Sequence, residues 1–257
     1  MCLLAFNWRP NHSTPLILVA NRDEFHERPA IPMHWWSGNQ GNPFELLAGK
    51  DLKAQGTWLG FNRSGRFAFL TNIRPGFIGV EGVRSRGDIP LLFLNSNSSI
   101  QQIAQSLKEN IDQFAGFNLI VGEPESLYWM SSNTPDLQPV KPGVHALSND
   151  ALDTPWPKVI MARQQMSEYS EQFETLLDGS GLLMDSNRAS DIELPDTGIP
   201  IVWERLLSSQ LIISEEYGTR SRCLFRLSNG QYDVVDQQLN KSGAVITEQR
   251  FSWTKGE

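Results

Sequence analysis

The 257-residue chain is poor in residues that bind metals or cross-link segments. It has two cysteines, Cys2 and Cys223, and four histidines. Two cysteines cannot form a disulfide framework or a zinc site, and the histidines lack HExxH or similar ligand spacing. The sequence therefore predicts a protein that works without a metal or other cofactor. With few cysteines and no signal peptide, we expect it in the cytosol.

Positive charge and long apolar segments are also scarce. Lysine and arginine number 22 against 29 aspartate and glutamate residues, so the formal net charge is −7 and the pI about 5.2. Such a protein is a poor nucleic-acid binder, because neutralising phosphates requires a basic surface. No apolar run approaches the roughly 18–20 residues of a membrane span. We expect a small-molecule substrate or an apolar ligand, and the sequence leaves the oligomeric state open.

Motifs of the nucleotide-binding and α/β-hydrolase folds are missing. Gly76, Gly79 and Gly82 recur at every third residue and do not form GxGxxG, and there is no P-loop or GxSxG elbow. Predicted hairpins outnumber βαβ crossovers. The order strands, helices, strands, long helix, strands favours an α+β fold with antiparallel sheets and segregated helices. The length and the lack of a linker or repeat favour one domain over residues 1–257.

Apolar periodicity and turn residues predict the individual elements. Helices are expected from Asp88 as the N-cap, over 100–112 after Ser99, and over 157–178. The segment 29–43, rich in proline and tryptophan, is expected to be a loop. Strands are expected at 2–7, 15–21, 45–49, 56–61, 66–71, 116–122, 126–131, 143–148, 219–227, 231–236 and 244–252.

Cys2 directly follows the initiator methionine. Methionine before a small residue is normally removed during synthesis, which would leave Cys2 with both a thiol and a free α-amine. An unperturbed α-amine has a pKa of about 7.7–8.0, so it can act as the general base for the thiol. Two other interpretations stay open. Cys2 could be a small apolar residue in a first strand, or an acylation site, although a lipoprotein cysteine follows a long signal peptide.

Four polar residues, Asn21 to Glu24, end the second predicted strand. Side chains alternate in an extended chain, so Asn21 and Asp23 should share one face, and Arg22 and Glu24 the other. A carboxylate at Asp23 could then lie close to the amine of Cys2, orient it and favour its charged form. The run could equally be a solvated turn.

Four segments together resemble the NRDE family, also called the transport-and-Golgi-organisation-2 family. They are MCLLAFNW, LVANRDEF, GTWLGFNRSGRFAFLTN and EYGTRSR, and the likeness runs over nearly the whole chain. That family in turn resembles the cysteine N-terminal-nucleophile hydrolases, such as choloylglycine hydrolases and penicillin V acylases. These enzymes have a four-layer αββα sandwich and cleave amide bonds. The resemblance therefore implies this fold and a hydrolase activity.

The resemblance also implies a nucleophile and the group that holds it. The nucleophile of those hydrolases follows the initiator methionine and matches Cys2. Their Asn-x-Asp, which holds the amine of the nucleophile, matches Asn21 and Asp23. They usually carry an arginine directly before this motif, where the present chain has Ala20. Its arginine is the middle residue, Arg22, so the charge that activates the thiol would be missing or would come from another residue.

Two asparagines and an arginine extend the match. The G-x-N-x-x-G segment of the hydrolases matches residues 60–65, and the oxyanion-hole asparagine that follows it matches Asn72. A second asparagine, after a short strand, matches Asn149, and a late arginine matches Arg220 or Arg222. Without the resemblance, the two asparagines could simply end strands or cap turns, and Arg220 could be a surface charge.

Together these features predict a cysteine N-terminal-nucleophile amidohydrolase that acts on a small acylated substrate. The expected catalytic residues are Cys2, Asp23, Asn72, Asn149 and Arg220, and the expected substrate-binding residues are Asn21, Arg22, Trp35 and Trp36. The alternative is a non-catalytic carrier for an apolar ligand, of the haem or acyl-lipid type that relatives are implicated in handling. In that case Trp35, Trp36 and Phe44 could line the cleft.

Overall fold

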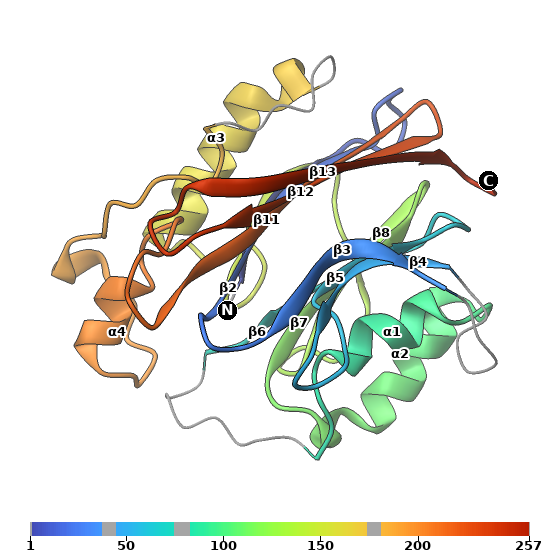
Figure 1. Cartoon of the computed structure of the whole chain (residues 1–257). Helices are drawn as coiled ribbons and strands as arrows, with labels where there is room; N and C mark the ends of the chain where they lie inside the picture. Colours follow the sequence, from blue (N-terminus) through green and yellow to red (C-terminus); the bar gives the residue numbers. More distant parts are fainter. Residues whose placement is uncertain (1, 38–44, 75–82, 174–180, 257) are drawn as a thin grey trace.

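Two antiparallel sheets face each other, and helices cover the outer side of each (Figure 1). The computed structural model describes residues 2–37, 45–74, 83–173 and 181–256. Along the chain the order is strands, two helices, strands, a long helix, a short helix and strands. The predicted α+β class with antiparallel sheets is therefore confirmed.

The first sheet contains strands from both the beginning and the end of the chain. Its strands are β1 (Cys2–Trp8), β2 (Leu16–Phe25), β10 (Gly143–Leu147), β11 (Tyr217–Ser228), β12 (Gln231–Leu239) and β13 (Val245–Thr254). They are hydrogen-bonded in the order β10–β1–β2–β11–β12–β13. The central strand β2 thus pairs with β1 on one side and with β11 on the other.

The second sheet is built from consecutive strands in the middle of the chain. Its strands are β3 (Ala30–Trp36), β4 (Leu46–Asp51), β5 (Leu59–Asn62), β6 (Phe67–Asn72), β7 (Phe117–Glu123), β8 (Ser126–Ser131) and β9 (Gln138–Pro139). They are hydrogen-bonded in chain order. In the turn between β5 and β6, Gly65 has a φ of +95°, which favours glycine. Its carbonyl accepts a hydrogen bond of 3.0 Å from the Tyr232 hydroxyl, which ties the two sheets together.

Within the described residues, four α-helices lie outside the sheets. They are α1 (Asp88–Leu94), α2 (Ile100–Glu109), α3 (Pro157–Phe173) and α4 (Ile201–Leu206). Helix α2 begins with a complete capping box between Ser99 and Gln102, as the serine predicts. Gly87 occupies the N-cap of α1, so Asp88 is the first helical residue and not the cap. The end of the helix predicted over 157–178 lies outside the described residues.

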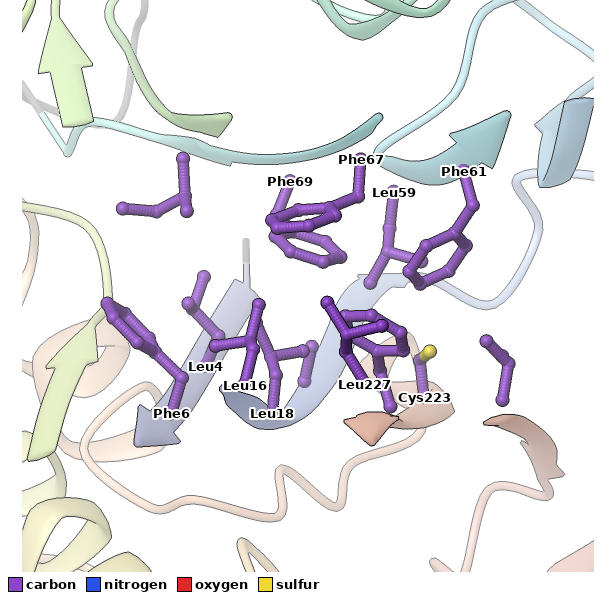
Figure 2. Close-up of a cluster of buried hydrophobic side chains, with 14 of the residues drawn as sticks. Leu4, Phe6, Leu16, Leu18, Leu59, Phe61, Phe67, Phe69, Cys223 and Leu227 are labelled. Atoms are coloured by element: carbon purple, nitrogen blue, oxygen red, sulfur yellow. The ribbon is translucent and has the colours of Figure 1, made fainter. Parts of the chain in front are cut away.

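Side chains of β1 point alternately into two different apolar layers. Leu4 and Phe6 face the second sheet, whereas Leu3 and Ala5 face α3. Phenylalanines from both sheets fill the inter-sheet layer, and Figure 2 shows Phe61, Phe67 and Phe69 opposite Leu4, Leu18 and Leu227. A third layer packs α1 and α2 against the outer face of the second sheet. Helix, sheet, sheet and helix therefore form the predicted four-layer αββα sandwich.

The segment 29–43 is not a loop throughout, because residues 30–36 form β3. This strand lies at the edge of its sheet, where Pro32 is tolerated, and the β3–β4 register shifts between Ile31 and His34. The sequence also failed to predict β9 and α4. Within the described residues, no helix has the length and apolarity needed to cross a membrane.

Candidate functional site

Cys2 begins β1, directly opposite Arg22 of β2. In this register Leu4 is opposite Ala20. Directly paired residues of antiparallel strands project from the same face, so Arg22 shares the inter-sheet face with Cys2. As expected, Arg22 projects from the opposite face of β2 to Asn21 and Asp23. This orientation brings its charge towards the thiol of Cys2. Arg22 therefore places a positive charge on the same face as Cys2, two residues after Ala20.

The Arg22 guanidinium is held in place by its neighbours. It donates to Asp51 Oδ2 over 3.3 Å and lies over the ring of Trp58, 4.1 Å from the ring centroid. Arg28 Nε donates to the same Asp51 oxygen over 2.6 Å. Burial acts to raise the pKa of Asp51, but the hydrogen bond and charge of Arg28 outweigh burial and lower it. Asp51 thus stays ionised and fixes both arginines at the end of β2.

A pocket of about 440 Å³ opens in front of Cys2, within the usual size range of ligand sites. Cys2, Asp23 and Asn72, which come from three strands, all line it. The lining residues are Cys2, Arg22, Asp23, Glu24, Arg28, Asp51, Lys53, Ala54, Thr57, Trp58, Leu70, Asn72, Val83, Arg84, Ser85, Arg86, Gly87 and Ala115. The structure therefore brings together the expected nucleophile, its expected orienting carboxylate and one expected oxyanion donor.

Asp23 is buried beside an irregularity of β11, where the register shifts between Thr219 and Ser221. The Thr219 hydroxyl donates to Asp23 Oδ1 over 2.7 Å, and the Tyr217 hydroxyl donates to the Asp23 backbone carbonyl over 3.0 Å. Burial raises the pKa of Asp23, although the charge of Lys158 and the Thr219 hydroxyl oppose this shift. The carboxylate is therefore positioned firmly, and its ionisation depends on nearby cations.

The thiol of Cys2 is also affected by burial. Burial raises its pKa above the ordinary value, Asp23 acts in the same direction, and Arg22 acts against it. The resting thiol is therefore protonated at neutral pH, so a base must remove its proton before it attacks. Both cysteines are free, but Cys223 is only 5% exposed in the inter-sheet core, and burial raises the pKa of its thiol much further.

Asn149 does not line the pocket as a second oxyanion donor would. It is buried, and its Nδ2 donates to the Asn72 backbone carbonyl over 2.9 Å and to Asn72 Oδ1 over 3.2 Å. The hydroxyl of Ser148 donates to Asn149 Oδ1 over 3.0 Å. Because Asn72 Oδ1 accepts a hydrogen bond from Asn149, Nδ2 of Asn72 is the atom that can donate to a bound molecule. Asn149 therefore orients Asn72.

Asn21 and Arg220 have structural partners outside this pocket. Asn21 Nδ2 donates to the carbonyls of Leu183 and Gln210 over 2.8 and 3.0 Å, on the helix side of the sheet. Arg220, the bulged residue of β11, donates to the carbonyls of Phe25 and Arg28. Arg220 therefore stabilises the segment that follows β2.

Arg222, the other candidate for the late arginine, is 2% exposed. It donates to the Leu182 carbonyl over 2.6 Å and to Gln237 Oε1 over 2.9 Å. The charge of Arg222 is therefore used on the helix side of the first sheet.

Trp35 and Trp36 also lie away from the pocket, on opposite faces of β3. Trp35 packs against Trp253 with a ring-centroid distance of 5.2 Å, and the Arg63 guanidinium lies over the Trp35 ring. Trp36 donates through its indole nitrogen to the Ala48 carbonyl over 2.9 Å and packs on the α1–α2 side. Strand alternation forces this divergence. Phe44 lies outside the described residues.

Lys158 and Arg86 are among the cations near Cys2 that the sequence did not reveal. Lys158, in the first turn of α3, is only 3% exposed, and burial and the charge of Arg74 lower its pKa to about 7 against the opposing effect of Asp23. A lysine in the first turn of an amphipathic helix normally reaches solvent, so its burial left no signal in the sequence. Arg86 lies between residues near Thr57 and residues near Gly116, which are distant in the sequence and meet only in the folded chain.

The comparisons with known proteins identify the family. The model of the Transport and Golgi organisation 2 family matches residues 1–241. A Transport and Golgi organization 2 homolog of Mus musculus is 32% identical over 263 residues, covering 93% of each chain. A homolog of Homo sapiens is 31% identical over 214 residues, covering 77% of this chain and 76% of its own. A solved conjugated bile acid hydrolase of Clostridium perfringens is 11% identical, with a TM-score of 0.45, over 99% of this chain and 98% of its own. On the family match and these identities, the chain belongs to the Transport and Golgi organisation 2 family.

Proposed function

We propose that the protein is a cysteine N-terminal-nucleophile amidohydrolase that acts on a small acylated amide. One observation carries this proposal. Cys2, Asp23 and Asn72 are far apart in the sequence, yet all three line one pocket of about 440 Å³. A nucleophile, a group that can orient its base and an oxyanion donor are the parts that acyl transfer requires. Met1, whose removal the proposal requires, lies outside the described residues.

The chemistry would use the free α-amine of Cys2 as the base. The amine takes the thiol proton while Sγ attacks the carbonyl carbon of the amide. The resulting tetrahedral oxyanion collapses, the C–N bond breaks, and the ammonium returns the proton to the leaving amine. Water, deprotonated by the same amine, then attacks the thioester carbonyl. The C–S bond breaks, the acid is released, and the ammonium returns its proton to Sγ. Arg22, opposite Cys2 in the β1–β2 register, favours the thiolate against the effect of burial.

Asn72 would donate its Nδ2 to the oxyanion. One well-placed donor of this kind contributes roughly 2.7–4 kcal/mol to the transition state. The hydrogen bond from Asn149 fixes the amide before substrate binds, so little reorganisation is needed during the reaction. This division of roles replaces the expectation that both asparagines donate.

The acyl group would lie in the open pocket and not between the sheets. The recess behind Cys2, towards Cys223, has a volume of about 10 Å³, which is at most the room for one water. A carrier for an apolar ligand would need an apolar cleft. The charged side chains that line the pocket, five cationic and three anionic, support a polar substrate instead. Because the chemistry needs a reduced thiol, we propose a cytosolic site of action.

The first test combines intact mass with alkylation. Processed protein should lack Met1, and iodoacetamide should label Cys2 much faster than the buried Cys223. Cys223→Ala is the matched control and should keep the labelling rate of Cys2. Retention of Met1, or labelling of Cys2 no faster than of Cys223, would remove the nucleophile from the proposal.

The second test is turnover. A screen of N-acyl amino acids and acyl homoserine lactones should find hydrolysis that Cys2→Ala abolishes and Cys223→Ala retains. If wild-type protein hydrolyses none of these compounds but binds an acyl lipid or haem, and Cys2→Ala binds it equally well, the carrier function replaces the hydrolase.

A further inference from the structure

Arg86 is a cation of the pocket that has no carboxylate partner among the described residues. Its side chain is half-buried and lines the same pocket as Cys2. Its Nη1 donates to the Gly116 carbonyl over 3.0 Å. Burial lowers the pKa of Arg86, and the opposing groups are Cys2 and Glu24. An arginine that is partly removed from water, with no ion pair in the part of the chain that the structure describes, is ready to bind an anion.

The other arginines of the pocket are already engaged. Arg22 and Arg28 lie 3.3 and 2.6 Å from Asp51, and both approach Glu24 at 4.0 and 3.8 Å. Arg84 pairs with Asp88 at 3.6 Å. The excess of positive charge in the pocket therefore resides at Arg86 and at Lys53. Lys53 is exposed, so water and salt screen its charge more effectively than that of Arg86.

The backbone around Arg86 is fixed from both sides. Thr57 N donates to the Gly87 carbonyl over 3.0 Å, and Gly87 N donates to Ser85 Oγ over 3.1 Å. Gly56 packs so closely on this segment that a Cβ there would come within 2.5 Å of the Gly87 backbone. A guanidinium on such a support needs little reorganisation to bind a ligand.

We propose that Arg86 binds an oxyanionic group of the substrate, such as a carboxylate, and so selects amides that carry this group close to the scissile bond. The proposal rests on the proposed hydrolase function, whose substrate class it defines. Guanidinium and carboxylate form paired hydrogen bonds of matching geometry. The protein as a whole is acidic, with a net charge of −7, whereas cationic residues outnumber anionic ones in the lining of the pocket.

Two alkylating agents of similar size test the charge directly. Iodoacetate is anionic and iodoacetamide is neutral, so the ratio of their rates at Cys2 at one pH cancels the fraction of thiolate. We expect this ratio to be higher in folded protein than in the same protein in urea. Arg86→Gln should lower it about tenfold, the effect of one unit charge at short range in a partly buried site. Arg86→Lys should restore part of it.

Arg250→Gln is the matched control, because Arg250 is an exposed arginine of β13 and should leave the ratio unchanged. An unchanged ratio in folded Arg86→Gln would overturn the proposal. Protein that is inert to both reagents would count against the proposed nucleophile and not against Arg86, so a binding measurement without the thiol is also required.

In the Cys2→Ala background, ligand-observed NMR should show that N-acetylglycine binds at least tenfold more tightly than N-acetylglycinamide. This preference should disappear when Arg86→Gln is added and weaken in 0.5 M salt. Equal binding of the two compounds to Cys2→Ala would overturn the assignment of Arg86, whatever the outcome for hydrolysis.

Discussion

Charged groups lie on both faces of the first sheet near Cys2. Arg22 projects from the same inter-sheet face as Cys2, and Arg86 reaches the thiol electrostatically from a separate segment that also lines the pocket. Asp23 and Lys158 interact with each other, and Lys158 lies on the helix that covers the opposite face. Charges on both faces therefore act on Cys2, because Lys158 interacts with Cys2 as well as with Asp23. These cations are useful because burial alone would keep the thiol protonated.

Lys158 should make the reactivity of Cys2 depend on pH near neutrality. Burial lowers the pKa of Lys158 to about 7, so its ammonium is present below this pH and is lost above it. Lys158→Met removes a cation that favours the thiolate. We expect alkylation of Cys2 by iodoacetamide to slow roughly three- to tenfold at pH 6 and less at pH 8.5. Lys241→Met, at an exposed position, is the control. A slowing that is equal at both pH values would contradict this role.

Asn72 and Asn149 should act as one unit on hydrolysis. Asn72→Ala removes the oxyanion donor and should lower kcat about 10²- to 10³-fold. Asn149→Ala leaves the donor but releases its orientation, so we expect a loss of about tenfold in kcat with little change in KM. The double variant should be no slower than Asn72→Ala, because residues in one network are not additive. Fully additive losses would show that Asn149 acts independently of Asn72.

At the scale of elements, the turn after β10 holds Asn149 in place. His145 Nδ1 and Asp153 Oδ2 lie 2.6 Å apart, and Asp153 Oδ1 accepts from Ala146 N over 2.9 Å. The Thr71 hydroxyl of β6 donates to the Ser148 carbonyl over 2.6 Å, so the turn is also tied to the second sheet. The site thus depends on contacts between elements that hairpin pairing alone does not provide.

The His145–Asp153 pair should stabilise the protein mainly in mild acid. Burial acts to lower the pKa of His145, but the hydrogen bond to Asp153, the hydrogen bond to the Lys141 carbonyl and the charge of Asp153 together outweigh burial and raise this pKa. A histidine whose pKa is raised on folding stabilises the folded protein below the unfolded pKa of about 6.5. This stabilisation is lost as the pH rises through the folded pKa. His145→Gln should therefore reduce the free energy of unfolding by about 1 kcal/mol more at pH 5.5 than at pH 8.5. Asp153→Asn should show the same difference in urea unfolding. A loss independent of pH would mean that the pair acts through packing alone.

The whole molecule is held together by the inter-sheet layer. Phe225 of β11 lies 4.7 Å from Phe61, 5.6 Å from Phe67 and 6.0 Å from Tyr232 between ring centroids. Strands from the C-terminal part of the chain thereby pack against the hairpins of the N-terminal half. Cys2 and Asn72 belong to different sheets, so this layer also sets the distance between the proposed nucleophile and the proposed oxyanion donor.

Phe225→Ala should be strongly destabilising. The side chain is fully buried, and the cavity left behind cannot collapse easily between two sheets. We expect a loss of about 3–5 kcal/mol in urea unfolding, and a smaller loss for Phe225→Leu, which keeps most of the volume. Equal losses for the two variants would indicate that ring geometry, and not volume, controls this layer.

Most strands and the three longer helices could be predicted from local pattern. Two apolar runs joined by a polar turn predicted β1 and β2, and Ser99 predicted the start of α2, because these signals lie within a few residues of one another. β3 was missed because its prolines and tryptophans are typical of a loop and are tolerated only by its edge position. Asp88 was misassigned as a cap by one residue, since boundaries depend on geometry that composition does not specify.

The sequence by itself determined the family, and through that resemblance the αββα class, because the motifs that carry it are local. The same motifs made Cys2, Asp23 and Asn72 the candidate site residues. Tertiary structure alone decided which charges surround Cys2. Strand register put Arg22 opposite the thiol, and helix docking buried Lys158. The packing of residues 84–87 against Thr57 and Gly116 directed Arg86 into the pocket. Electrostatic effects act through space and depend on burial, so residues distant in the chain determine them and no local pattern can report them.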